Sequence, residues 1–213
     1  MRLVSCYNLI VQEIVYKIGD SLYLNITNRC TNQCSFCIRN KSRLFNQKHH
    51  LWLENEPSAE EILKAIGNPS RFKQIVFCGY GEPLIRLEIV KAVASALKSE
   101  CPETKIRIDT NGHANLFWGR NILPELKGLI DSLSISLDTE SAELYEKICH
   151  PLFGKISYGA ILEFIKAAKQ SIPEVEISVV DLPAVDKEKA KRIAKELGVH
   201  FRTRPYYENS YVK

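Results

Sequence analysis

The stretch CTNQCSFC, residues 30–37, places Cys30, Cys34 and Cys37 within eight residues of a chain that has seven cysteines among its 213 residues. It follows an apolar, β-branched run at residues 22–27, which is typical of a buried strand. Three thiolates on one short loop can ligate three irons of a cubane cluster and leave the fourth iron without a protein ligand. The stretch therefore predicts a metal centre with one open position at the end of a strand.

A zinc site is the alternative interpretation of these cysteines. Its fourth ligand would be a distant side chain such as Cys78, His49 or His50. Structural zinc sites typically pair two CxxC segments, and the chain has no second CxxC. The spacing therefore favours the three-cysteine cluster.

The composition is that of an ordinary globular protein, with 45% hydrophobic and 25% charged residues, so we expect one domain that spans residues 1–213. No apolar run approaches the ~20 residues that a membrane span needs. Asn8, Gln12 and Glu13 interrupt the apolar start, so we expect no signal peptide, no membrane segment and a cytoplasmic location. In that compartment clustered thiols bind metals or act in redox reactions. The net charge of +4 is too small to indicate a nucleic-acid partner, but it suits an acidic redox partner.

Strand and helix patterns alternate along the chain. A hairpin at residues 14–18 and 22–27 leads into the first strand, and β-rich runs follow at residues 74–78, 105–109, 132–137, 175–180 and 200–204. Helix signals lie at residues 59–66, 87–97, 115–126, 158–168 and 187–197. The alternation predicts an α/β fold with parallel strands. Two long intervals, residues 38–57 and 138–157, follow strands, and so fall at the sheet edge where α/β folds carry their active sites.

The spacing of Cys30, Cys34 and Cys37, with Phe36 before the last cysteine, resembles the signature loop of the radical S-adenosylmethionine (SAM) superfamily. The resemblance implies a partial (β/α)6 TIM-like barrel, here preceded by the short hairpin. It also implies a [4Fe-4S] cluster whose unique iron chelates SAM. Reductive cleavage of SAM then gives a 5′-deoxyadenosyl radical, which abstracts hydrogen from a substrate. Phe36 would lie near the adenine, or else pack under the loop.

A second segment, CGYGEP at residues 78–83, is similar to the GGEP motif of the same superfamily. The resemblance implies that Gly79, Tyr80, Gly81 and Glu82 lie against the amino group of SAM. Glycine allows the backbone to approach a ligand closely, and a carboxylate accepts from an ammonium group. The alternative is a tight turn in which Glu82 caps the next helix.

Two further strands end in polar residues, in the segments IDTNG (residues 108–112) and SISLD (residues 134–138). By themselves Asp109 and Asp138 would be interpreted as caps or turn residues. DTNG, however, resembles the pyruvate formate-lyase activating enzymes. That resemblance implies that Asp109, Thr110, Ser136 and Asp138 lie beside SAM and help to hold a monovalent cation. Ser136 and Asp138 are alternatively candidates for contact with the ribose.

Several other residues are weaker candidates. Ile177 and Val179 would form an apolar wall of the site or simply pack in the core. Arg202 and Arg204 share one face of the last strand and would reach either a carboxylate in the site or water.

Cysteines outside the loop and the histidine pair are also weak candidates. Cys149 lies in the long interval after the fourth strand, and is a candidate donor of a hydrogen atom or thiolate as well as a structural cysteine. Cys6 and Cys101 are expected to have no role in a cluster. His49 and His50 would belong to a lid or to an exposed loop.

Together the motifs NxTNRC, FCIR, LWLE, GYGEP and DTNGHANL most resemble the small radical SAM proteins associated with TatD-type nucleases. The function that follows is a radical SAM enzyme with an unidentified substrate, a protein or other macromolecule included, and an electron donor such as flavodoxin or ferredoxin. One alternative is an activase that makes a glycyl radical on a partner protein. The other is a non-catalytic iron–sulfur or zinc protein.

Overall fold

The computed structural model describes residues 12–42 and 44–206. Its main sheet has seven strands in the order β1-β2-β5-β6-β7-β8-β9. The strands are β1 (Val15–Ile18), β2 (Ser21–Leu24), β5 (Gln74–Phe77), β6 (Ile106–Thr110), β7 (Ser132–Ser136), β8 (Glu174–Val180) and β9 (His200–Arg204). Strand β1 pairs antiparallel with β2, and every later neighbour pairs in parallel. The predicted hairpin and six parallel strands are thus confirmed.

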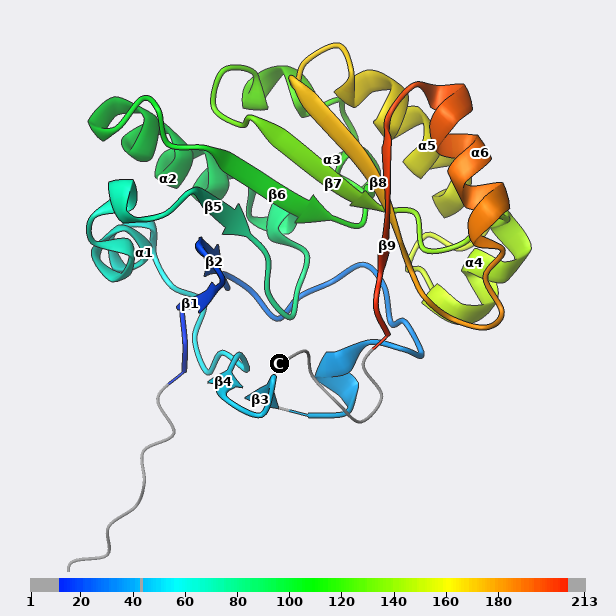
Figure 1. The fold of residues 1–213 in the computed structure, drawn as a ribbon, viewed down its shortest axis with the longest axis horizontal. Coiled ribbons are helices and arrows are strands. Elements are labelled where there is room, and N and C mark those ends of the chain that lie inside the picture. Colours follow the sequence, from blue (N-terminus) through cyan, green and yellow to red (C-terminus); the bar gives the residue numbers. More distant parts are fainter. Residues whose placement is uncertain (1–11, 43, 207–213) are drawn as a thin grey trace, which may run out of the picture.

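The helices connect successive parallel strands. They are α1 (Ala59–Ile66), α2 (Leu87–Glu100), α3 (Ala114–Trp118), α4 (Ala142–Cys149), α5 (Ile156–Ala168) and α6 (Lys187–Leu197). Short 3-10 turns lie at η1 (Ile38–Asn40), η2 (Pro69–Arg71), η3 (Pro83–Arg86) and η4 (Leu123–Leu126). Figure 1 shows α2, α5 and α6 along the outer face of the curved sheet, with the blue segment that follows β2 at the carboxyl ends of the strands.

The sheet curves but does not close, because β1 and β9 are its two edges and do not pair with each other. This is the predicted partial TIM-like barrel. A large apolar core lies between the sheet and its helices, with Phe77, Ile108, Leu133 and Phe164 almost fully buried in it. Within the described residues, no helix is both long and apolar enough to cross a membrane.

Local signals explain most helix ends. Ser58 and Glu61 form the expected capping box at α1, and Asp186 caps α6 by accepting from the backbone of Lys189. The prediction of a single helix at residues 115–126 was wrong. The segment contains the two separate elements α3 and η4, because Gly119 adopts a left-handed conformation with φ 63° and ends α3.

Two elements in the long intervals were not predicted. Helix α4 fills part of residues 138–157, with Ser141 as its N-cap. The interval 38–57 contains η1 and a small second sheet of β3 (Leu44–Phe45) and β4 (His49–His50). His49 and His50 are buried, and His49 contacts the carboxylate of Glu13 at 3.2 Å, so the exposed-loop interpretation was wrong.

Candidate cluster and cofactor site

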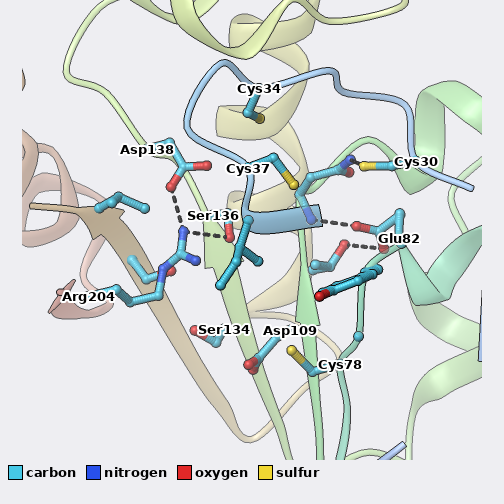
Figure 2. A pocket seen from close by; sticks show the side chains of 18 of the residues that line it. Cys30, Cys34, Cys37, Cys78, Glu82, Asp109, Ser134, Ser136, Asp138 and Arg204 are labelled. Atoms are coloured by element: carbon cyan, nitrogen blue, oxygen red, sulfur yellow. Dashed lines mark hydrogen bonds and ion pairs between the residues drawn. The ribbon is translucent and has the colours of Figure 1, made fainter. Parts of the chain in front are cut away.

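A pocket of about 330 Å³ opens at the carboxyl ends of the parallel strands. Most residues that the motifs predicted for the site line it: Cys30, Cys34, Phe36, Cys37, Gly79, Tyr80, Gly81, Glu82, Asp109, Thr110, Ser136 and Asp138. Figure 2 shows the three cysteines in the upper part of the view, with Glu82 just below Cys30 and with Asp109 and Cys78 at the lower end. Segments that lie far apart in the sequence therefore meet at one site.

The three loop cysteines suit a cluster better than a single metal ion. Tetrahedral Zn–S bonds of ~2.3 Å hold ligand sulfurs about 4 Å apart. In the described chain, Cys30, Cys34 and Cys37 do not form a group of ligand atoms within 4.8 Å of one another. Neither Cys78, His49 nor His50 completes such a group with them. The donor set is thus open enough for a cubane, which spreads its ligand sulfurs over several irons.

Backbone hydrogen bonds fix the cysteine loop against the end of α4. The amides of Gln33 and Ser35 donate to the carbonyls of Cys149 (3.0 Å) and Ile148 (2.8 Å), on either side of Cys34. The amide of Leu152 donates to the carbonyl of Thr31 at 2.8 Å. The first two bonds satisfy carbonyls at the end of α4 that have no partner within the helix.

Arg39, in the FCIR segment, also stabilises the cysteine loop through hydrogen bonds to its backbone. Its guanidinium donates to the carbonyls of Asn28 and Asn32, both at 2.9 Å. Burial raises the pKa of Cys30 to about 12, so this thiol needs positive charge nearby to ionise. Iron ions would supply that charge.

The GYGEP turn passes very close to the segment that follows β2. A Cβ atom on Gly79 would lie 2.2 Å from the side-chain oxygen of Asn25. A Cβ on Gly81 would lie 2.4 Å from the carbonyl oxygen of Thr27. Only glycine fits at either position, so the turn holds its backbone against the first strand and lines the pocket with it.

Glu82 is buried at the end of this turn, and both of its oxygens have partners. One oxygen accepts from the amide of Leu84 (3.0 Å) and the hydroxyl of Thr110 (2.8 Å), and the other from the amide of Asn111 (2.6 Å). Burial raises the pKa of Glu82 to about 7. The capping interpretation of Glu82 is confirmed, and the carboxylate also links η3 to the end of β6.

A buried polar network lies behind the cysteine loop, and the sequence analysis missed it. Asn111 donates from its side-chain amide to Thr31 Oγ1 (2.8 Å), which contacts Nδ1 of His113 (3.0 Å). Nε2 of His113 contacts the hydroxyl of Tyr145 (3.3 Å), which accepts from Asn32 (2.7 Å). Burial lowers the pKa of His113 to about 4, which keeps the ring neutral. The segment NGH directly after DT was the available signal.

Arginine side chains contact the acidic residues of the pocket. Arg204 donates to Asp138 (2.5 Å) and Ser136 (3.2 Å). Arg107 forms an ion pair with Asp109 at 2.8 Å. Three of the four residues predicted to hold a monovalent cation thus already have an arginine partner, and the fourth, Thr110, donates to Glu82. Arg202 reaches the carboxylate of Glu176 at 2.8 Å, so the last-strand arginines contact carboxylates.

Three weaker candidates lie outside the pocket lining. Ile177 and Val179 are fully buried in the apolar cores, because residues alternate along β8 and it is Ser178 and Val180 that line the pocket. Cys149 is fully buried and does not line the pocket, which favours its structural interpretation over a role as a donor to substrate. Cys6 lies outside the described residues.

Other pocket residues were not predicted. Tyr16 and Tyr23 are register partners in the β1–β2 hairpin, with ring centroids 5.2 Å apart, and both line the pocket. Phe45 of β3 lines it as well, and its ring lies 5.8 Å from that of Tyr16. The 38–57 interval is therefore a wall of the pocket. Alternation in the hairpin could have revealed the two tyrosines, but nothing in the sequence placed Phe45 over them.

A model of the radical SAM superfamily matches residues 24–197, and the chain therefore belongs to that superfamily of enzymes. Its members use a [4Fe-4S] cluster and SAM, which confirms the predicted cofactors. A GTP 3′,8-cyclase of Lactiplantibacillus plantarum is 31% identical over 62% of this chain and 37% of its own length. An uncharacterized protein of Methanocaldococcus jannaschii is 27% identical over 82% of this chain and 52% of its own length. The chain thus spans about half or less of these relatives.

Solved structures share the fold. The structure of Streptococcus suis SuiB bound to the precursor peptide SuiA aligns with a TM-score of 0.60, at 16% identity, over 91% of this chain and 41% of that chain. At this identity the likeness supports the fold alone.

Proposed function

We propose that the protein cleaves SAM reductively and directs the resulting radical to a hydrogen atom of a macromolecular substrate such as a peptide. One observation carries the proposal: the three loop cysteines and the GYGEP turn line the same pocket at the carboxyl ends of the strands. When bound, the cluster and SAM supply one-electron cleavage of the sulfonium and a 5′-deoxyadenosyl radical.

In this proposal the residues of the chain bind the cluster and SAM and orient them. Cys30, Cys34 and Cys37 hold the cluster. The backbone of residues 79–81 offers carbonyl groups to the amino group of SAM, at a turn that only glycine permits. Ser136 lines the pocket and would contact a hydroxyl of the ribose, and Phe36, which also lines it, would offer an aromatic face to the adenine.

A macromolecular substrate is supported by the open edge of the sheet. Because β1 and β9 do not pair, the barrel is not closed on that side, which favours a substrate larger than the pocket. The SuiB structure, in which a protein of this fold is bound to a precursor peptide, supports a peptide as the substrate. GTP is the second candidate, because a GTP 3′,8-cyclase is among the relatives.

An acidic electron donor such as flavodoxin or ferredoxin is supported by the distribution of charge. Residues 28–53, which include the cysteine loop, contain five Lys or Arg residues and no Asp or Glu. One of these five, Arg29, forms an ion pair with Glu56, and the segment is otherwise basic. A field of this sign steers an acidic partner toward the loop.

Anaerobic reconstitution with iron and sulfide, followed by reduction and measurement of 5′-deoxyadenosine, tests the proposal. Single replacement of Cys30, Cys34 or Cys37 by Ala is expected to abolish cleavage of SAM, whereas Cys101→Ala, outside the pocket, is expected to retain it. An intact cluster that cleaves no SAM under strong reductant would instead indicate a non-catalytic protein. Deuterium transfer into 5′-deoxyadenosine from labelled peptide pools or labelled GTP identifies the substrate class, and a stable glycyl-radical signal on a partner would indicate an activase.

A further inference from the structure

Cys149, the last residue of α4, lies directly behind the cysteine loop. Its Sγ, the Sγ of Cys34 and a carboxylate oxygen of Asp138 all lie within 4.8 Å of one another. A cysteine thiol with its ordinary pKa of about 8.5 is protonated at neutral pH. The Cys149 thiol is hydrogen-bonded to Cys34, one of the three predicted cluster ligands.

The backbone holds the two sulfurs together. Gln33 and Ser35, which flank Cys34, both donate to carbonyls at the end of α4, one of which belongs to Cys149 itself. These two hydrogen bonds, one on either side of Cys34, hold the backbone of Cys34 against the end of α4. The contact is thus built into the way the loop is attached to the fold.

Two other roles for Cys149 do not fit this geometry. Ligand sulfurs on different irons of a cubane are separated by the body of the cluster. A sulfur this close to Cys34 cannot also hold the fourth iron. A donor of hydrogen to substrate would have to reach the pocket, but Cys149 is fully buried and outside its lining.

We propose that the Cys149 thiol donates a hydrogen bond to the Cys34 sulfur when that sulfur is bound to the cluster, and thereby raises the reduction potential of the cluster. Hydrogen bonds to the ligand sulfurs are one of the means by which a protein sets this potential, because they stabilise the more negative, reduced state. Cys149 is in this sense a positioning and tuning residue that acts through Cys34. The inference rests on the proposed cluster.

Replacement of Cys149 by Val and by Ser separates the hydrogen bond from packing. Val fills the site with a somewhat larger side chain that has no donor, whereas Ser keeps a hydroxyl donor in a smaller one. After anaerobic reconstitution, redox titration followed by electron paramagnetic resonance is expected to give Cys149→Val a more negative midpoint potential than the wild type. Cys149→Ser is expected to lie closer to the wild type, and Cys101→Ala to match it.

Equal potentials in the wild type and Cys149→Val would overturn the inference. Equal shifts in the Val and Ser variants would overturn it too, because they would show an effect of packing alone. Failure of the wild-type protein to take up a cluster would instead count against the proposed function, so the two failures are distinguishable.

Discussion

The side-chain amide of Asn111 donates to Thr31 Oγ1 at 2.8 Å, and so joins the end of β6 to the residue that follows Cys30. The same hydroxyl contacts Nδ1 of His113. Replacement of Thr31 by Val removes the hydroxyl that both buried groups contact, and we expect the free energy of unfolding of the apo protein to fall by about 1–3 kcal/mol. Thr31→Ser keeps the hydroxyl and is expected to lose much less in urea unfolding. A Thr31→Val protein as stable as the wild type would show that these hydrogen bonds do not contribute to stability.

His113 makes stability depend on pH. Burial lowers its pKa to about 4 in the folded protein, whereas the pKa of an unfolded histidine is about 6.5. The unfolded chain therefore binds more protons between these values, and the contribution to stability is lost as the pH falls from about 6.5 toward 4. We expect about 2 kcal/mol of this loss between pH 7 and pH 5, from urea unfolding. His113→Gln should show a shallower pH dependence over this range, and an unchanged slope would refute the assignment.

The replacement Glu82→Gln is expected to destabilise the protein. Each of its oxygens accepts from a backbone amide, Leu84 on one side and Asn111 on the other. In Glu82→Gln the NH2 group must face one of these donors in either orientation, so a buried amide loses its acceptor. We expect a loss of about 1–3 kcal/mol in the free energy of unfolding at pH 8. An unchanged midpoint in urea would mean that the carboxylate is not held as the structure places it.

Gly81 and Gly159 provide a matched pair of glycine replacements. A methyl group on Gly81 would meet the carbonyl oxygens of Thr27 and Arg29 at 2.4 and 2.5 Å, so Gly81→Ala must displace backbone. Gly159 lies inside α5, and a methyl group there would meet no atom within 4 Å, so Gly159→Ala is expected to stabilise by about 0.5–1 kcal/mol. Thermal unfolding compares the two. A Gly81→Ala protein as stable as the wild type would contradict the close approach.

Arg204 occupies the position at which a monovalent cation was predicted to contact Asp138 and Ser136. Its guanidinium already contacts Asp138 and Ser136, two of the residues expected to hold that ion. We therefore expect binding of SAM, measured by calorimetry on the reconstituted protein, to be the same in potassium and in tetramethylammonium buffers. Arg204→Ser removes the side-chain charge and is expected to weaken binding and to make it depend on the cation. Strong potassium dependence in the wild type would restore the original prediction.

The sequence predicted the strands, the cysteine loop and the GYGEP turn because each depends on local pattern: alternation, spacing and glycine. It did not reveal α4, whose apolar residues fall in an interval interpreted as an insertion, although Ser141 was a usable N-cap signal. The contacts of Arg204 with Asp138 and of Tyr145 with His113 join residues 66 and 32 positions apart. Such contacts follow from the curvature of the sheet, which no local pattern encodes.

The attachment of the cysteine loop to α4 has a consequence for how the protein loses iron. His150 ends α4 in a left-handed conformation, and the last carbonyls of the helix are bonded to the loop and not to further helix. Fraying of this one helix end would release the residues on both sides of Cys34 while the sheet stays folded. Bleaching of the cluster on mild warming would then report local opening at α4, at temperatures well below those that melt the barrel.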